Sequence, residues 1–247
     1  MPDPVSAPAG SRQVGLITAD PTPTLLSLVS HWNIDFVVLD AEQTTLTLQQ
    51  CADAAQRLAG TRVQVAVRVP DLAEMTLVAF ANTGVDELVL PRVRHPGELE
   101  RARRATTFGP GGSRPRQVSF ASAFGADYSR RPRLSVLFET VEALDNVADF
   151  VASEFFEGGW VGPTDLADDL RVHGRTGADA LDAAVQRVVD TIASAGHSAG
   201  LPASNLASTS AVHARGADRA AVYWEREVAS MIAQLATSHL GLRVDAA

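Results

Sequence analysis

Residues 160–169 read WVGPTDLADD and combine the end of an apolar strand, a Gly-Pro turn and the start of a helix. The acid Asp165 stands at this junction. Two interpretations are open. Thr164 or Asp165 can cap the helix, because its first turn carries unpaired N–H groups and its dipole favours a negative charge. Alternatively, Asp165 is a functional carboxylate.

The same strand-to-helix pattern recurs along the whole chain. Short apolar strands alternate with amphipathic helical stretches such as residues 47–59 and 97–106. Eight such units in 247 residues predict a single-domain (β/α)₈ TIM barrel over residues 13–247, with an open doubly wound sheet as the alternative. The strands are predicted over 14–19, 36–41, 63–69, 87–93, 134–140, 158–163, 198–203 and 219–224.

Segments outside the predicted units also carry information. Residues 1–12 are typical of a disordered tail and lack the regions of a signal peptide, so we expect a cytoplasmic protein. No apolar run approaches the ~20 residues that span a bilayer. The longest interval, residues 108–133, is predicted to be a lid or an interface segment rather than a plain connector.

Composition excludes several classes of function. The formal net charge of −8 argues against a nucleic-acid or anionic-membrane partner. All 21 basic residues are arginine, so imine catalysis by a lysine and a P-loop are both excluded. The single cysteine excludes a disulfide framework and a cysteine-rich metal site.

Polar side chains follow three of the predicted strands. Arg68 ends the third strand on the face opposite its valines, Glu139 ends the fifth, and Asp165 follows the sixth. In a barrel these carboxyl ends build the active site, and neighbouring strands lie ~4.8 Å apart. Two carboxylates that leave open coordination positions suit Mg²⁺ or Mn²⁺ better than Zn²⁺. The alternative for Glu139 is a salt bridge to Arg68.

The chain resembles the HpcH/HpaI aldolase and citrate lyase β-chain-like family over residues ~13–240. Members are metal-dependent (β/α)₈ barrels that make or break carbon–carbon bonds next to a 2-oxo acid through a metal-bound pyruvate enolate, and others decarboxylate oxaloacetate-like acids. The resemblance rests on ordered motifs with the family's spacing, namely FVVLDAEQ, VAVRVP, GVDELVLPRV, GGSR, LFETVEALDNV and WVGPTDLADDL.

The resemblance implies a role for each matching position. Glu139 and Asp165 match the metal ligands, with Mg²⁺, Mn²⁺ or another divalent ion as the cofactor. Arg68 matches the arginine that stabilises the enolate oxygen. Arg114 lies in a G-x-R motif typical of the family and is a candidate for binding the substrate. The substrate carboxylate is expected at the helix start formed by Gly162, Pro163, Thr164 and Asp165.

Three positions depart from the family pattern. Gln43 replaces the acid/base histidine, Asn82 replaces the aspartate that pairs with it, and Leu137 replaces a glutamine two residues before the metal-binding Glu139. An amide cannot act as a general base near pH 7. The half of the site that handles protons is therefore altered, while the half that stabilises an enolate is retained.

These departures leave two classes of function open. Decarboxylation of a 3-carboxy-2-oxo acid removes no proton, whereas retro-aldol cleavage needs a base, for which Glu42 or metal-bound water are candidates. We therefore expect a metal-dependent carbon–carbon lyase of aldolase or decarboxylase type. The alternative is a homologue that keeps the metal and oxo-acid pocket but binds a ligand or performs other chemistry.

The end of the chain is expected to mediate assembly. Its predicted helix carries Val228, Met231, Ile232 and Leu235 on one stripe, which must be buried. The resemblance implies a homohexamer in which this last helix packs on a neighbouring subunit, with active sites near the interfaces. The only other partner expected is a small-molecule 2-oxo acid.

Overall fold

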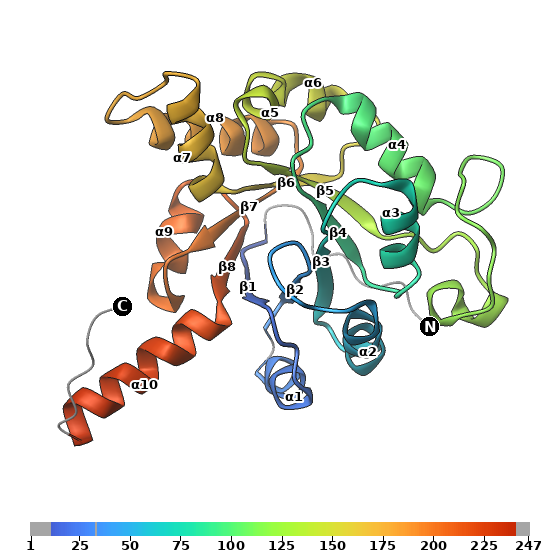
Figure 1. The fold of residues 1–247 in the computed structure, drawn as a ribbon, viewed down its shortest axis with the longest axis horizontal. Helices are drawn as coiled ribbons and strands as arrows, with labels where there is room; N and C mark the ends of the chain where they lie inside the picture. Colours follow the sequence, from blue (N-terminus) through green and yellow to red (C-terminus); the bar gives the residue numbers. More distant parts are fainter. Residues whose placement is uncertain (1–10, 33, 241–247) are drawn as a thin grey trace.

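The computed structural model describes residues 11–32 and 34–240, and within them eight parallel strands close into one barrel (Figure 1). Each strand pairs with the next along the chain, and β8 closes onto β1. The predicted (β/α)₈ barrel is confirmed and the open sheet is excluded. The strands are β1 (Gln13–Thr18), β2 (Phe36–Asp40), β3 (Gln64–Arg68), β4 (Glu87–Leu90), β5 (Arg133–Phe138), β6 (Gly158–Val161), β7 (Ser198–Ala203) and β8 (Arg219–Tyr223).

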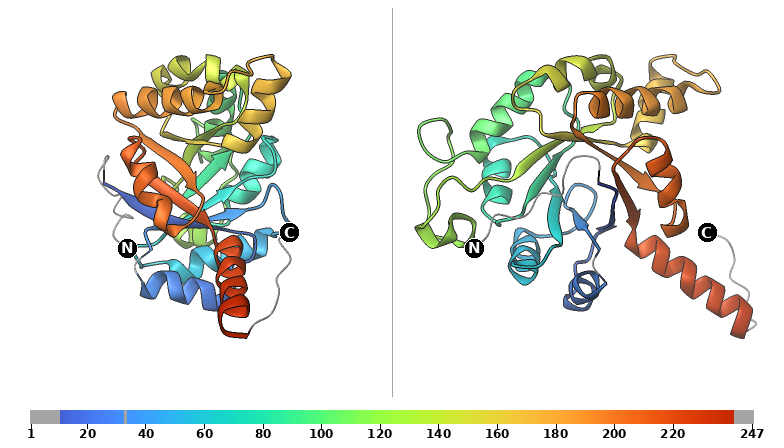
Figure 2. Two further views of the ribbon diagram at one scale, coloured as in Figure 1. Left: turned by 90° about the vertical axis from the view of Figure 1, so that its left-hand side faces the viewer. Right: turned by 180° about the vertical axis from the view of Figure 1, so that it is seen from behind.

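Helices connect successive strands and surround the barrel (Figure 2). Most of the predicted tail, residues 1–12, lies outside the described residues. No helix in the part that is described is long and apolar enough to cross a membrane. The α-helices are α1 (Pro23–His31), α2 (Leu48–Leu58), α3 (Glu74–Ala81), α4 (Pro96–Thr106), α5 (Val141–Asp145), α6 (Val147–Ala152), α7 (Pro163–Val172), α8 (Ala180–Ser194), α9 (Thr209–Ala214) and α10 (Trp224–Leu240), and 3₁₀ turns span Phe120–Gly125 and Leu206–Ser208.

Most strands end one to three residues earlier than predicted, and proline explains the difference at β4 and β6. β4 ends at Leu90 because Pro91 has no N–H to donate to the ladder, and the next residue, Arg92, has a φ of +54°. β6 ends at Val161 because Pro163 opens α7 at the first helical position. The remaining strands lie within two residues of the predicted bounds.

The barrel separates two apolar cores. The larger core lies between the strands and the helices, and the smaller one fills the barrel interior with residues such as Phe36, Ala66 and Trp160. Glycines make room for the two large rings, since a Cβ on Gly15 would lie 2.2 Å from the Phe36 ring and one on Gly200 would lie 2.4 Å from Trp160.

An ion cluster lies beneath the apolar interior, with Glu87 and Arg219 fully buried and Arg133 partly exposed. Both carboxylate oxygens of Glu87 accept hydrogen bonds from Arg219 Nη1, at 2.9 and 2.8 Å, and Oε2 also accepts one from Arg133 at 2.6 Å. The Trp160 indole N–H donates to Glu87 Oε1 at 3.3 Å. The Arg219 guanidinium stacks on the Phe36 and Trp160 rings, so charge pairing and aromatic packing hold this layer together.

The long segment between α4 and β5 does not form a lid over the strand ends. A helix that follows a parallel strand returns the chain to the amino ends of the strands, so residues 107–132 lie at the end of the barrel opposite the carboxyl ends. None of them lines the main cavity described below. The lid prediction is therefore wrong for the single chain, and the interface prediction stays untested.

The last helix leaves the barrel instead of packing on it. Figure 1 shows α10 projecting away from β8, and the view from behind in Figure 2 agrees. Its start is fixed by Glu225, whose Oε1 accepts hydrogen bonds from Thr18 Oγ1 at 2.6 Å and from the Ala19 N–H at 2.9 Å. The predicted stripe on this helix is largely exposed at Met231, Ile232 and Leu235.

Candidate active site

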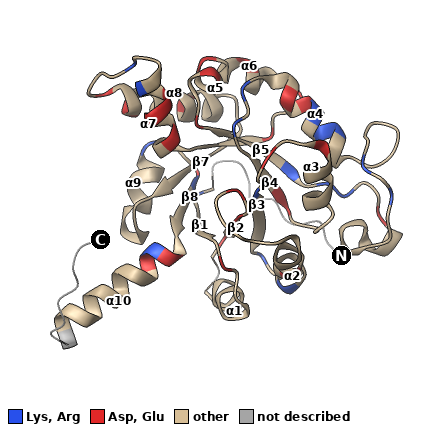
Figure 3. Cartoon of the chain, viewed as in Figure 1, with Lys and Arg blue, Asp and Glu red and all other residues tan. Residues whose placement is uncertain are grey.

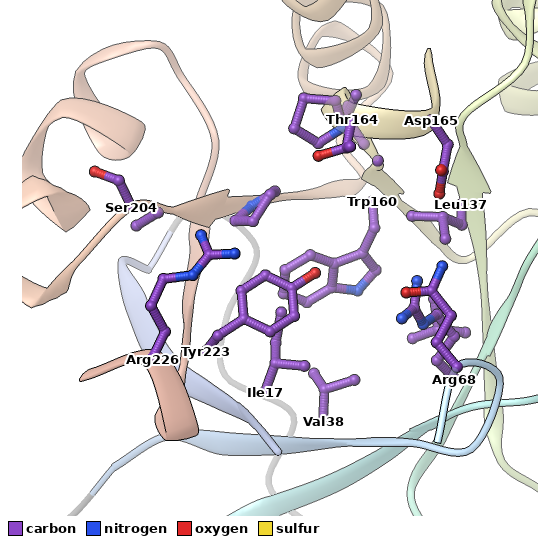
Figure 4. Close-up of a pocket in the computed structure, with 17 residues that line it drawn as sticks. Ile17, Val38, Arg68, Leu137, Trp160, Thr164, Asp165, Ser204, Tyr223 and Arg226 are labelled. Atoms are coloured by element: carbon purple, nitrogen blue, oxygen red, sulfur yellow. The ribbon is translucent and has the colours of Figure 1, made fainter. Parts of the chain in front are cut away.

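A cavity of about 500 Å³ opens at the carboxyl ends of the strands. Its walls come from most of the strands and from the turn between β6 and α7 (Figure 4). Of the predicted site residues, the cavity is lined by Gln43, Arg68, Gly162, Pro163, Thr164 and Asp165, and its other lining residues are Ile17, Val38, Val89, Leu137, Trp160, Val161, Pro202, Ala203, Ser204, Tyr223 and Arg226.

Arg68 is held by an aspartate on the neighbouring strand. Asp40 and Arg68 are register partners at the ends of β2 and β3. Asp40 accepts hydrogen bonds from Arg68 Nε at 2.9 Å and from Nη2 at 2.5 Å, and its Oδ1 also accepts the N–H groups of Glu42 and Gln43. One carboxylate thus orients both the guanidinium and the loop that carries Gln43. Burial lowers the pKa of Arg68, but Asp40 and Glu42 raise it overall.

Glu42 lies behind Arg68 and is almost fully buried. Its Oε2 lies 3.3 Å from Arg68 Nη1 and its Oε1 lies 3.1 Å from Arg92 Nη2. Oε2 is buried and accepts no hydrogen bond within the described residues. Burial raises the pKa of this carboxyl above its ordinary value, opposed by Arg68 and Arg92. The two arginines therefore do not fully offset the cost of burying the negative charge of Glu42.

Glu139 lies just outside the lining of the cavity and makes no ion pair with Arg68. Its Oε1 accepts the backbone N–H of Arg92 at 2.7 Å, and the positive φ of Arg92, which is strained for a non-glycine residue, belongs to this turn. A Cβ on Gly162 would lie 3.2 Å from Glu139 Oε2, so the glycine lets the turn approach the carboxylate. The alternative of an Arg68–Glu139 salt bridge is wrong, because Arg68 pairs with Asp40 and Glu42.

Burial, together with the charges of Glu42 and Asp165, raises the pKa of Glu139 to about 7, and the hydrogen bond from the Arg92 N–H opposes this increase. Glu139 and the side chain of Glu42 are buried, whereas Asp165 is exposed at the rim, and the three carboxylates repel one another. No group of three or more metal-binding side chains is preformed within residues 11–32 and 34–240. Two uncompensated carboxylates, and the unbonded buried oxygen of Glu42 beside them, nevertheless fit a divalent cation that completes its shell with water or substrate oxygens.

The start of α7 presents free N–H groups to the cavity. Pro163 occupies the first helical position, and no side chain caps this helix. The N–H groups of Thr164 and Asp165 make no hydrogen bond in the part of the chain that is described. Capping by the side chain of Thr164 or Asp165 is therefore wrong as an explanation of the motif. The turn instead offers two donors and a carboxylate to a ligand.

Two predicted site positions lie at the other end of the barrel. Asn82 follows α3 and precedes β4, at the amino ends of the strands, whereas Gln43 follows β2 at the carboxyl ends. The two positions that match the family's histidine–aspartate pair are therefore not adjacent within one chain. Arg114 accompanies Asn82: its Nε donates to Asn82 Oδ1 and its Nη2 to the Ala81 carbonyl, both at 2.8 Å. Arg114 is buried there, and it does not line the cavity.

Several residues of the site were missed by sequence reasoning. Asp40 belongs to a quoted motif, and its position opposite Arg68 follows from strand register, which was a usable signal. Trp160 belongs to the apolar interior of the barrel and also lines the cavity. Tyr223 and Arg226 come from the end of β8 and the first turn of α10, where no motif marks them.

Comparisons with known proteins identify the family of this chain. The sequence profile of the HpcH/HpaI aldolase/citrate lyase family matches residues 13–226. The hydroxypyruvate/pyruvate aldolase of Cupriavidus necator is 29% identical over 202 residues, which are 78% of this chain and 74% of that protein. The 4-hydroxy-2-oxo-heptane-1,7-dioate aldolase of Shigella sonnei is 27% identical over 207 residues, which are 80% and 78% of the two chains.

Solved structures show the same fold. An HpcH/HpaI aldolase/citrate lyase family protein from Burkholderia cenocepacia superposes with a TM-score of 0.83 at 21% identity, over 94% of this chain and 96% of that chain. Macrophomate synthase has a TM-score of 0.75 at 20% identity, over 94% and 86% of the two chains.

Proposed function

The chain belongs to the HpcH/HpaI aldolase/citrate lyase family, and we propose that it is a divalent-metal-dependent carbon–carbon lyase that acts on a 2-oxo acid through an enolate. The observation that carries the proposal is the placement of Arg68. Its guanidinium is oriented by Asp40 at the wall of a cavity that also holds Asp165 and the free N–H groups of α7.

Each part of the site has a role in this proposal. Glu139 and Asp165 would hold Mg²⁺ or Mn²⁺, which supplies Lewis acidity to the substrate when bound. The N–H groups of Thr164 and Asp165 bind the substrate carboxylate at the helix start, with Gly162 and Pro163 shaping the turn. Arg68 donates hydrogen bonds to the enolate oxygen, where negative charge develops during the reaction.

Proton handling decides between decarboxylation and aldol cleavage. Gln43 lines the cavity at the predicted position of the acid/base group, and an amide cannot take a proton near neutral pH. Loss of CO₂ from a 3-carboxy-2-oxo acid needs no base, so this reaction is favoured. Glu42 is the proposed base for any cleavage of a hydroxy acid, since burial raises the pKa of its carboxyl.

The presence of Gln43 at the acid/base position also favours a second candidate function. A cavity with its binding groups in place but without the proton-transfer histidine also suits a homologue that binds a 2-oxo acid without cleaving it. A cytoplasmic location stays a prediction. Assembly as a homo-oligomer is proposed from the exposed apolar stripe of α10, and the family resemblance suggests a homohexamer.

An activity assay tests the proposal directly. Purified protein is given oxaloacetate or 4-hydroxy-2-oxo acids with Mg²⁺ or Mn²⁺, and pyruvate release is followed with and without a chelator. We expect metal-dependent pyruvate release that Arg68→Ala abolishes and that Arg101→Ala, an exposed change on α4, leaves intact. Binding of pyruvate without turnover of any substrate would support the binding-protein alternative.

A further inference from the structure

The cavity is larger than the reacting end of a 2-oxo acid requires. A three-carbon oxo acid has six heavy atoms, and at the ~30 Å³ that a water molecule occupies in the liquid for each, it fills less than about 200 Å³. The cavity measures about 500 Å³. If the oxo acid is held between Arg68 and Asp165, more than half of the volume lies toward the opposite wall.

That opposite wall carries an arginine. Figure 4 shows Arg68 and Asp165 on one side of the cavity and Tyr223 and Arg226 on the other, with the Trp160 indole between them. The Arg226 guanidinium points inward beside Tyr223, with its Cζ 5.2 Å from the centre of the Tyr223 ring.

Arg226 differs from the other arginines near the site. Arg68 pairs with Asp40 and Glu42, and Arg92 pairs with Glu42. Among the described residues, no carboxylate lies within ion-pair distance of Arg226, and the Tyr223 hydroxyl makes no hydrogen bond. The far wall thus offers a positive charge and a hydroxyl donor that no described residue engages in an ion pair or a hydrogen bond.

The position of Arg226 is set by the residue before it. Glu225 bonds to Thr18 Oγ1 and to the Ala19 N–H at the end of β1, which pins the first turn of α10 to the barrel. Arg226 therefore stays at the rim of the cavity whatever surface the rest of α10 covers. Figure 3 shows this turn as a small group of charged residues at the start of α10, whereas the next part of that helix is uncharged.

We propose that Tyr223 and Arg226 form a second anion-binding subsite, so that the substrate is a 2-oxo acid with a carboxylate or a phosphate-type group at its far end. The inference rests on the proposed function, which places the oxo-acid end at Arg68 and Asp165. A guanidinium binds either group by two parallel hydrogen bonds, and the Tyr223 hydroxyl supplies a further donor. The subsite selects the substrate and takes no part in bond cleavage.

Binding of matched probes tests the subsite. The dissociation constants of 2-oxoadipate and 2-oxohexanoate, which have the same chain length but differ in the charge of the far end, are measured by calorimetry with Mg²⁺ present. A third probe, 2-oxo-5-phosphonopentanoate, distinguishes a phosphate-type preference from a carboxylate preference. We expect at least one dianion to bind about tenfold more tightly than 2-oxohexanoate at low salt, with a smaller ratio at high salt.

The variants locate the preference. Arg226→Gln should bring the ratio close to one, Arg226→Lys should retain part of it and Tyr223→Phe should reduce it, whereas Arg101→Gln should keep the wild-type ratio. Equal affinities in the wild type, or a ratio that survives Arg226→Gln, overturn the subsite while 2-oxohexanoate binding leaves the proposed function standing. If neither pyruvate nor 2-oxohexanoate binds, the proposed function and the subsite fail together.

Discussion

The carboxylate of Asp40 holds the guanidinium of Arg68 through two hydrogen bonds, 2.9 Å from Nε and 2.5 Å from Nη2. The two residues end neighbouring parallel strands in register, so the barrel backbone sets their separation. Asp40 also accepts the N–H groups of Glu42 and Gln43. A single buried carboxylate therefore positions the group that faces the developing charge and the loop that carries Gln43.

Removing the charge of Asp40 should slow the reaction without removing any group that touches the substrate. We expect Asp40→Asn to lower kcat by about 10- to 100-fold, because a misplaced Arg68 stabilises the enolate poorly. Arg68→Ala should lower kcat by about 10²- to 10³-fold. Steady-state kinetics check both, with circular dichroism to confirm folding. Because Asp40 acts through Arg68, the double variant should be no slower than Arg68→Ala; fully additive losses would argue against a positioning role.

Metal binding should depend on two carboxylates that stand on successive strand ends. We expect one Mg²⁺ or Mn²⁺ per chain, and Glu139→Gln or Asp165→Asn should abolish tight binding because the remaining acid offers a single ligand. Calorimetric titration measures this without any substrate. Asp168→Asn is the matched control, since Asp168 lies on the same helix but is exposed and paired with Arg171. Unchanged titrations in both site variants would remove these residues as ligands.

Restoring the histidine and the aspartate of the family pattern at Gln43 and Asn82 tests the part of the site that would transfer protons. Aldol cleavage by the wild type is expected to be weak, and Gln43→His should raise it, since a general base contributes ~10²–10⁴-fold. Gln43→His with Asn82→Asp should raise it further. Because the two positions lie at opposite ends of one barrel, we expect this extra gain only in assembled protein. The rate of pyruvate release, measured at protein concentrations above and below the dissociation constant of the oligomer, tests whether the gain depends on assembly. A double variant no faster than Gln43→His contradicts the pairing.

The projecting helix α10 should drive assembly. Met231, Ile232 and Leu235 are largely exposed on it, and a contiguous apolar stripe of this kind is stabilised by burial against another surface. We expect a homo-oligomer by light scattering at micromolar concentration, with a hexamer as the predicted state. Ile232→Glu with Leu235→Glu should dissociate it, whereas Val172→Glu, at an exposed apolar residue on α7, should not. A wild-type monomer would refute the prediction.

The ion cluster inside the barrel should make stability depend on acid. Burial alone would raise the pKa of Glu87, but Arg133 and Arg219 lower it to about 2. A carboxyl with a lowered folded-state pKa stabilises the fold above its unfolded value of 4.5, and this contribution is lost as pH falls toward 2. From that shift, the free energy of unfolding should fall by on the order of 3 kcal/mol over this window.

Urea denaturation of the wild type and of Glu87→Gln between pH 2.5 and 6 measures this effect. The variant should lose much of the pH dependence and should be less stable at pH 6 by about 3–5 kcal/mol, because Arg219 is left buried without its partner. Glu100→Gln, at an exposed glutamate on α4, is the control and should behave as the wild type does. Identical pH profiles for wild type and Glu87→Gln would show that the cluster does not titrate in this range.

Local patterns in the chain were sufficient for the architecture. Alternation of apolar strands with amphipathic helices predicted eight strands, and β7 was predicted with its observed bounds. These patterns work because side-chain periodicity follows directly from backbone geometry. The predicted ends of β4 and β6 lay beyond the observed ones, although Pro91 and Pro163 in the sequence already indicated where these strands stop.

The sequence by itself also placed Arg68, Gln43 and Asp165 at one end of the barrel, because the direction of each strand follows from the fold class. Only the tertiary structure decided which groups pair. In the structure Arg68 pairs with Asp40 and not with Glu139. Arg114 and Asn82 lie at the opposite end of the barrel, and Arg226 lines the cavity. Pairing depends on strand register and on how far each side chain reaches across the closed barrel, and neither quantity is contained in a local motif.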